Sequence, residues 1–228
     1  GLVTQYEQDD ALDGDRLAKL ITETLCDESN TGIREVIEEV TRRSDQIAET
    51  LGKETPNIKL PINNFHLPNE LYSPLQDALV HCLTNAIDHG IEVAGIREKR
   101  GKPKNGTIEF TLTELPAHIE LVIEDDGQGI NLNQVKEKLN NTNPDNYDDL
   151  SDNQLIKQIF TSGFSTATAI TESSGRGVGL DAVFVTMQQH GGSIAAEAAG
   201  PINEHGYVPI RFIMLLPKSL ETPASKSA

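Results

Sequence analysis

Hydrophobic residues recur every three or four positions in the stretch that ends in HCLTNAIDHGIE, and this spacing predicts a helix over about residues 69–89. The apolar positions form one stripe, which predicts a buried face: Leu71, Leu75, Leu79, Cys82, Leu83 and Ala86. His81, Asn85 and Asp88 share a different stripe of the same helix. We expect the helix to end near Gly90 in a left-handed cap.

The polar stripe of this helix combines an imidazole, an amide and a carboxylate. These groups suit a site for a metal ion and phosphate, but a plain polar surface has the same composition. The stripe alone therefore leaves both interpretations open.

The remaining pattern predicts a mixture of strands and helices. Alternating or continuous apolar runs predict strands over 58–62, 107–112, 118–123, 193–198 and 207–216. Helical spacing predicts helices over 13–25, 33–51, 155–160 and 178–190, and the stretches 131–152 and 161–179 are expected to be loops, the first with one helical turn around 135–139. Because the strands are joined as hairpins rather than as βαβ units, the fold class expected is α/β, a two-layer α/β sandwich.

Three segments are expected along the chain. Residues 1–54 form an N-terminal helical segment, residues 55–217 a compact α/β domain, and residues 218–228 a disordered tail. The helix over 33–51 has an apolar stripe that includes Ile47 and Leu51. Two such amphipathic helices can form a hairpin, pair with a second copy as a homodimer, or pack on the domain, and spacing does not decide between these arrangements.

Composition narrows the class of partner and the compartment. Among 228 residues, 35 are acidic and 19 basic, a net charge of −16, which argues against nucleic acid as a partner. The one basic stretch is 90–106. Two cysteines, Cys26 and Cys82, indicate packing thiols in a reducing compartment, and neither a signal peptide nor an apolar run of membrane-spanning length is visible. We expect a cytoplasmic fragment of a longer protein, and the sequence does not say whether that parent is membrane-anchored.

The sequence EDDGQG follows directly on the predicted strand 118–123. Such a run places a carboxylate at the sheet edge, while Gly127 and Gly129 let the backbone approach a ligand closely. The carboxylate can accept a hydrogen bond from an exocyclic amine such as that of adenine. A simple turn is the alternative, because Asp and Gly are usual turn residues. A calcium loop is disfavoured, since the further oxygen ligands of an EF-hand are missing.

A second glycine-rich run opens the helix predicted over 178–190. It consists of Gly175, Arg176, Gly177, Val178, Gly179 and Leu180. Glycines at a helix N-terminus expose backbone donors to a phosphate. The run lacks the βαβ context of a dinucleotide fold and the GKS or GKT of a P-loop. A phosphate site of another kind and a flexible hinge both remain.

Four motifs in order carry a resemblance: HxxxNxxDHG, DDGxG, IFxxGFST and SGRGVGLD. Together they resemble the nucleotide-binding domain of the histidine kinases, in the superfamily shared with gyrase, Hsp90 and MutL, and especially the chemotaxis kinases of the CheA type. The resemblance covers about residues 55–217 and is much weaker over residues 1–54.

The resemblance implies a site for ATP and Mg²⁺ between the helix layer and a lid. Asn85 matches the residue that helps hold Mg²⁺. His81 matches a position for a magnesium or phosphate contact and a catalytic proton acceptor, and Asp126 matches the carboxylate that binds adenine. The other residues implied are Asp88 and His89 at the rim, Gly127 and Gly129 in the wall, and Gly175, Arg176, Gly177, Val178, Gly179 and Leu180 in the lid. The third motif supplies Phe160, Phe164, Ser165 and Thr166, whose aromatic pair either reports nucleotide occupancy or is plain core.

The implied reaction transfers the γ-phosphoryl group of Mg-ATP to a histidine on another domain or protein, with a response regulator downstream. None of the six histidines has the setting of an acceptor, namely an exposed position before Asp or Glu on an amphipathic helix. We therefore expect a chain that binds ATP without phosphorylating itself.

Two positions depart from the chemotaxis pattern. Thr84 stands where Arg usually precedes the motif asparagine, and HGYVP at 205–209 replaces the usual Gly-Thr before the last strand. These departures motivate a second hypothesis, a nucleotide-gated interaction module that binds ATP without productive transfer. An ATPase of the gyrase or Hsp90 branch and an anti-sigma kinase are disfavoured, because both expect Glu at the position of His81.

Overall fold

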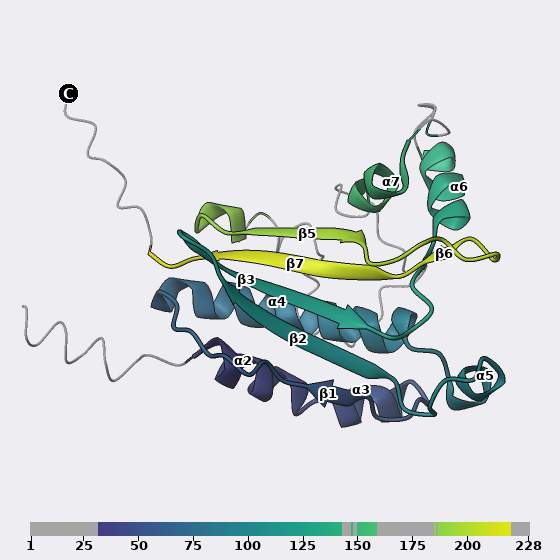
Figure 1. Cartoon of the computed structure of the whole chain (residues 1–228), viewed down its shortest axis with the longest axis horizontal. Coiled ribbons are helices and arrows are strands. Elements are labelled where there is room, and N and C mark those ends of the chain that lie inside the picture. The colour runs from purple at the N-terminus through teal and green to yellow at the C-terminus, as the bar shows by residue number, and fades with distance from the viewer. Residues whose placement is uncertain (1–31, 143–146, 148–149, 159–184, 186, 220–228) are drawn as a thin grey trace, which may run out of the picture. The chain divides into compact units, whose positions relative to one another are not determined.

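The computed structural model describes residues 32–142, 147, 150–158, 185 and 187–219 (Figure 1). The chain divides into two compact units between Thr31 and Gly32, and the described residues all belong to the second. The helix predicted over 13–25 and the tail from residue 220 lie outside the described residues.

One five-stranded sheet forms the first layer. It contains β1 (Asn57–Lys59), β2 (Thr107–Glu114), β3 (His118–Asp125), β5 (Ser193–Ala198) and β7 (Ile210–Pro217). The order is β1-β2-β3-β7-β5, with β1 and β2 parallel and the other neighbours antiparallel. The strands predicted over 107–112, 118–123 and 193–198 are therefore confirmed.

The strand predicted over 207–216 is divided at Pro209, which has no N–H for a ladder hydrogen bond. Its first part is β6 (Tyr207–Val208), which pairs with β4 (Ile130–Asn131) in a separate ribbon. Its second part is β7, which pairs with β3 and β5 in the main sheet.

The central helix is confirmed as η1 (Asn69–Leu71), α4 (Tyr72–Asn85) and the π-helical turn η2 (Ala86–Gly90) in succession. The other described helices are α2 (Ile33–Thr41), α3 (Ser44–Thr50), α5 (Ala94–Lys99), α6 (Leu132–Thr142) and α7 (Asp152–Gln158). The prediction of a loop with one helical turn over 131–152 was wrong in part. The buried Leu132, Val135 and Leu139 give α6 an apolar stripe inside a polar sequence.

The single helix predicted over 33–51 is two helices with a turn at Arg42 and Arg43. The turn changes which side of the second helix is buried. In α3 the buried residues are Ser44 and Ala48, whereas Leu51 is 37% exposed.

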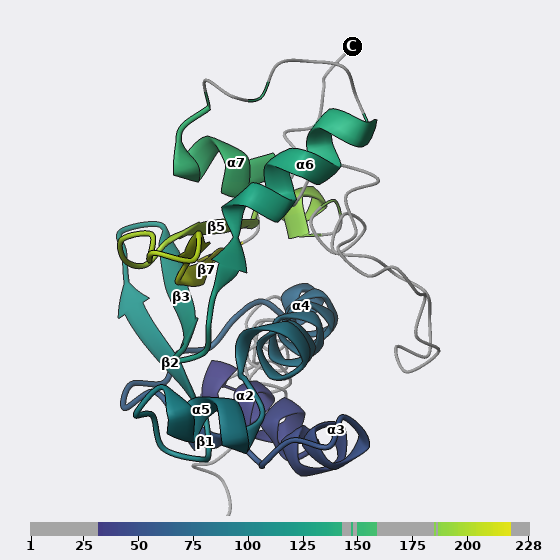
Figure 2. The same cartoon turned by 90° about the vertical axis from the view of Figure 1, so that its right-hand side faces the viewer.

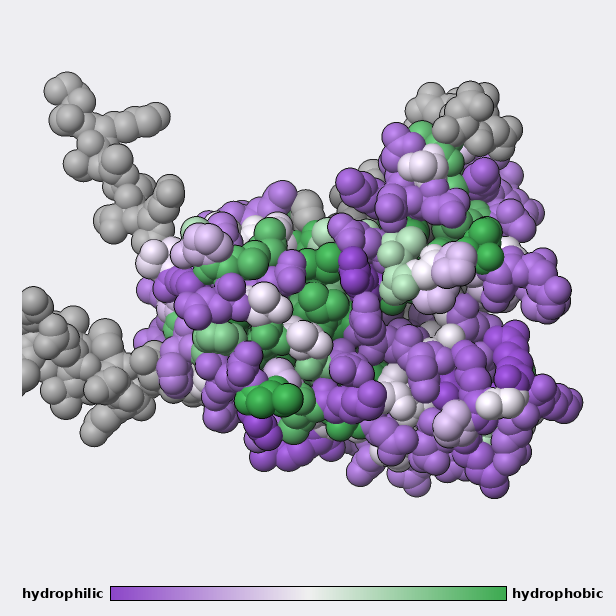
Figure 3. Space-filling model, in the orientation of Figure 1, coloured by the Kyte–Doolittle hydropathy of each residue, from purple (hydrophilic) through white to green (hydrophobic). Residues whose placement is uncertain are grey.

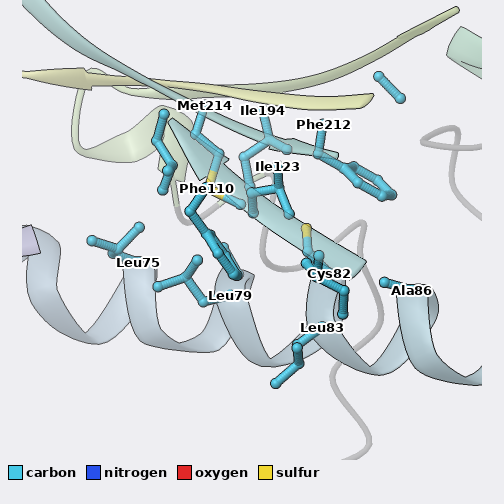
Figure 4. Close-up of a cluster of buried hydrophobic side chains, with 14 of the residues drawn as sticks. Leu75, Leu79, Cys82, Leu83, Ala86, Phe110, Ile123, Ile194, Phe212 and Met214 are labelled. Carbon is cyan, nitrogen blue, oxygen red and sulfur yellow. The ribbon is translucent and has the colours of Figure 1, made fainter. Parts of the chain in front are cut away.

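α2 and α4 pack against each other and form the second layer (Figure 2). All six apolar residues predicted for the buried face of the central helix are at most 4% exposed. They share one core with buried side chains of the sheet: Ile108, Phe110, Leu112, Ile119, Leu121, Ile123, Ile194, Ala196, Phe212, Met214 and Leu216. Figure 4 shows part of this core, with Phe110, Ile123 and Met214 among the labelled side chains of the sheet. Together with the mixed sheet this confirms the two-layer α/β sandwich.

The helices before residue 54 were expected to form a hairpin, to pair with a second copy or to pack on the domain. Helix α2 packs on the domain. A separate role for residues 1–54 stays a prediction. Cys82 is a buried free thiol, and burial raises its pKa to about 12, which agrees with a packing role. On the opposite face of the sheet, Val122 and Ile213 are partly buried. Figure 3 shows the protein from this side, where hydrophobic (green) and hydrophilic (purple) residues are mixed.

Candidate functional site

The end of the central helix meets the loop that follows β3. The backbone N–H of Gln128 donates to the Gly90 carbonyl at 2.8 Å, and its side-chain Nε2 donates to the His89 carbonyl at 3.3 Å. The structure thus brings the polar stripe of the helix and the EDDGQG run together, although they are some forty residues apart in sequence.

Glycine is needed at this junction because the two segments touch. A Cβ on Gly127 would collide with the Gly90 carbonyl, and a Cβ on Gly90 would lie 2.7 Å from Asp125 Oδ1. The left-handed cap expected at Gly90 was wrong, since Gly90 is not among the glycines with positive φ. The helix instead ends in the π-helical turn η2, in which Ile91 N–H donates to the Ala86 carbonyl at 2.7 Å.

Asp125 is the carboxylate that faces the helix layer. Residues 119, 121 and 123 of β3 are buried, and Asp125 continues this alternation on the same side of the strand. Its Oδ1 accepts a hydrogen bond from Gly127 N–H at 3.0 Å. Burial raises the pKa of Asp125 to about 6, and the neighbouring charge of Asp126 acts in the same direction.

Asp126, assigned to adenine on the motif, is engaged by the protein itself. Its Oδ2 accepts from Arg97 Nη2 at 3.0 Å, and its Oδ1 accepts from Thr107 N–H at 2.9 Å. These bonds hold Asp126 toward α5 and β2. Sequence reasoning missed Asp125, and the signal that identifies it is the strand period, which places 125 and not 126 on the side of the buried residues.

The basic stretch 90–106 is largely paired within the fold rather than free to bind a partner. Arg97 is fully buried and bonds Glu92 at 3.1 Å and Asp126 at 3.0 Å. Glu92, whose side chain is 2% exposed, also pairs with Arg100 and Lys102. Desolvation acts to raise the pKa of Glu92, but the hydrogen bonds it accepts and these cations outweigh it, so its pKa is lowered. Lys102 Nζ in addition donates to the carbonyls of Asp126 and Gly127, each at 2.8 Å.

The remaining predicted residues of the helix lie on its half-buried side. His81, Asn85 and Asp88 are partly buried, and His89 is exposed with its Nε2 3.5 Å from Asp88 Oδ2. The Thr84 hydroxyl donates to the Val80 carbonyl at 2.8 Å, a bond within its own helix. In the part of the chain that is described, no group of three or more His, Cys, Asp or Glu side chains forms a metal cluster.

Several predicted site residues lie outside the described residues, so their place in the site stays a prediction. They are Phe160, Phe164, Ser165 and Thr166 of the third motif, and Gly175, Arg176, Gly177, Val178, Gly179 and Leu180 of the lid.

A mixed sheet backed by helices, with a partly buried carboxylate facing the polar end of one helix, matches a known class. Residues 71–218 match the family described as histidine kinase-, DNA gyrase B-, and HSP90-like ATPase. The chain belongs to this family. The expectation from the four ordered motifs is thereby confirmed.

Curated relatives make the class more specific. The chain is 36% identical to the chemotaxis protein CheA of Borreliella burgdorferi over 80% of its own length and 22% of the relative's. It is 35% identical to CheA of Bacillus subtilis, covering 72% of this chain and 25% of the relative, and 35% identical to a gliding motility regulatory protein of Myxococcus xanthus, covering 67% and 20%. The chain is thus a CheA-like ATP-binding catalytic domain of the histidine kinase type, and it spans at most a quarter of the length of these relatives.

A solved structure agrees on the fold. The mycobacterial sensor histidine kinase MprB superposes with a TM-score of 0.52 at 21% identity, over 83% of this chain and 98% of that one. Among the described residues, no helix is both long and apolar enough to cross a membrane.

Proposed function

We propose that this domain binds Mg-ATP and transfers the γ-phosphoryl group to a histidine on another domain or protein in two-component signalling. The observation that carries the proposal is the partly buried carboxylate of Asp125, at the end of β3 and against the end of the helix that carries Asn85. Membership of the ATPase family and similarity to CheA support it.

Base recognition is assigned to Asp125 in place of Asp126. A carboxylate with a partly buried environment gains more from a hydrogen bond to an exocyclic amine than an exposed one does, because water competes less. With a pKa of about 6, the Asp125 carboxyl is mostly ionised at neutral pH, and an ionised carboxylate is the stronger acceptor for an amine N–H. Gly127 and Gly129 shape the wall beside it, and Gly129 adopts a positive φ of 77°.

Phosphate and metal binding are assigned to the polar stripe. Mg²⁺ commonly takes one or two protein oxygens and completes its shell with phosphate and water, so the amide oxygen of Asn85 fits this ion without a protein cluster. Bound Mg²⁺ would neutralise charge on the phosphates. His81 is proposed as a phosphate or metal contact and as the proton acceptor, with Asp88 and His89 at the rim. Residues 175–180, as the lid, and the residues of the third motif are proposed to complete the nucleotide site.

Calorimetric titration with a non-hydrolysable ATP analogue, with and without Mg²⁺, tests the site. We expect Asp125→Asn to weaken binding about 10- to 100-fold, the value of one hydrogen bond to a charged group, while Asp126→Asn changes it only a few-fold. The opposite ranking would return base recognition to Asp126. Failure of the unaltered chain to bind at millimolar nucleotide would overturn the proposal.

A nucleotide-gated interaction module is the second candidate. Thr84 favours it, because its hydroxyl is bonded to Val80 and it supplies no positive charge for phosphate. Tight binding of Mg-ATP without transfer to a supplied acceptor domain would support this alternative. The proposed partners are a histidine-containing phosphoacceptor domain and a downstream response regulator, and a homodimer through the N-terminal helices remains a prediction.

A further inference from the structure

The carbonyl groups at the end of a helix have no partner within the helix, so they must bond elsewhere or to water. In the segment 86–91 every carbonyl has a partner within the protein. The Ala86 carbonyl accepts from Ile91 N–H, and those of His89 and Gly90 accept from Gln128. The other three, of Ile87, Asp88 and Ile91, all accept from one group.

That group is the side-chain ammonium of Lys53. Its Nζ lies 2.7 Å from the Ile87 carbonyl, 2.5 Å from that of Asp88 and 2.8 Å from that of Ile91. An ammonium has three donors, so these bonds use all of them. Burial lowers the pKa of Lys53, while the charges of Asp88 and Glu92 act to raise it.

Lys53 is itself fixed to the N-terminal helices. Its backbone N–H donates to the Ala48 carbonyl of α3 at 2.9 Å, and Gly52 before it adopts a positive φ of 64° that turns the chain back. The Lys53 ammonium therefore connects α3 to the π-helical turn that carries Asp88 and His89.

We propose that Lys53 is a positioning residue for the nucleotide site, which holds the turn 86–91 in the shape that presents Asp88 and His89 and receives the loop of Gln128. This inference rests on the proposed function for its effect on ATP. A π-helical turn is an uncommon conformation that is frequent at functional sites, and here two of its carbonyls, those of Ile87 and Asp88, bond a side chain from a distant segment. Through Lys53, helix α3 thus helps to hold the turn 86–91 in place.

The test compares Lys53→Met, which keeps the aliphatic stem and removes the donors, with Lys53→Arg, which keeps the charge but spreads the donors over a larger, planar group. Lys59→Met is the matched control, because Lys59 is exposed and pairs with the exposed Glu109. Hydrogen–deuterium exchange of the nucleotide-free chain is measured over 86–92 and over the β2–β3 hairpin. Titration with the ATP analogue follows on the same samples.

We expect Lys53→Met to speed exchange over 86–92 at least tenfold, with the hairpin unchanged, and to weaken nucleotide binding at least tenfold. Lys53→Arg should fall between Lys53→Met and the unaltered chain, and Lys59→Met should equal the latter. A Lys53→Met chain that only melts at lower temperature, with exchange over 86–92 and affinity unchanged, would overturn the proposal.

If Lys53→Met does not fold, the arginine variant decides by the same two measurements. If the unaltered chain binds no nucleotide, the proposed function fails, whereas the exchange over 86–92 still tells whether Lys53 holds the turn.

Discussion

Asp125 and Asp126 are neighbours in the chain, yet the fold puts them in different environments. A strand directs successive side chains to opposite faces, so Asp125 turns toward the helix layer and Asp126 toward Arg97. The first is partly buried with a raised pKa, and the second is ion-paired with Arg97 just after the end of β3. Two adjacent carboxylates thereby become available for different tasks.

Asp125→Asn should make the domain more stable at neutral pH while it weakens nucleotide binding. The folded-state pKa of about 6 lies above the usual 3.8, so the folded protein keeps this proton over a range where the unfolded chain has lost it. Stability from this group is therefore present below about pH 4 and is lost as pH rises through 6. Urea denaturation should show the variant more stable by roughly 2 kcal/mol at pH 7, and equal near pH 4. A difference that does not vary with pH would contradict this origin.

Arg97→Met should strongly destabilise the domain. The guanidinium is fully buried, and its loss removes partners from Glu92, Asp126 and the Pro103 carbonyl. Breaking a buried pair from one side typically costs about 3–5 kcal/mol. Lys104→Met is the control, because Lys104 pairs with Glu98 where both are exposed, and such pairs contribute about 0–1 kcal/mol. Equal losses in urea denaturation at pH 7 would show that the Arg97 network is not structural.

At the scale of elements, α2 belongs to the domain core. Ile33 and Ile37 are fully buried, and α2 packs beside α4. The helical period alone identified the apolar stripe, but the surface that covers it was decided by the fold. Residues 32–54 consequently share their stability with the sheet.

Ile37→Ala should therefore destabilise the whole domain by about 2–5 kcal/mol, as expected for a buried aliphatic side chain cut to a methyl group. Ile62→Ala makes the same chemical change at a side chain that is 95% exposed, and it should change the free energy of unfolding by less than about 0.5 kcal/mol. Thermal unfolding of both variants, followed by the circular dichroism of the β-sheet, measures the two effects. An Ile37 variant with an unaltered transition would mean that α2 is dispensable for the core.

At the scale of the whole molecule, the proposed function places the acceptor histidine on another domain or protein. Incubation with ATP labelled in the γ-phosphoryl group should leave this chain unlabelled and should label a supplied histidine-containing acceptor domain. Asn85→Ala, which removes the proposed oxygen ligand for Mg²⁺, should reduce that transfer at least tenfold. Stable label on this chain alone would show that one of its six histidines is an acceptor.

The sequence by itself determined the parts whose signal is local. The central helix, the strands β2, β3 and β5, the fold class and the family all follow from periodicity and from short ordered motifs. Within a strand or helix the side-chain direction is set by the backbone repeat, so the pattern of apolar residues carries this information.

Only the tertiary structure decided which distant groups meet. Lys53 bonds carbonyls 34 to 38 residues away, and Arg97 reaches Asp126 across 29 residues. The tertiary structure also decided the break between α2 and α3, and the pairing of the basic stretch 90–106 with groups of the same domain. Such contacts leave no period in the sequence, because each depends on how two separate elements pack. The proposed assignment of base recognition to Asp125 rather than Asp126 needed both the sequence and the structure. The strand alternation puts Asp125 on the side of the buried residues, and the fold shows that this side faces the helices.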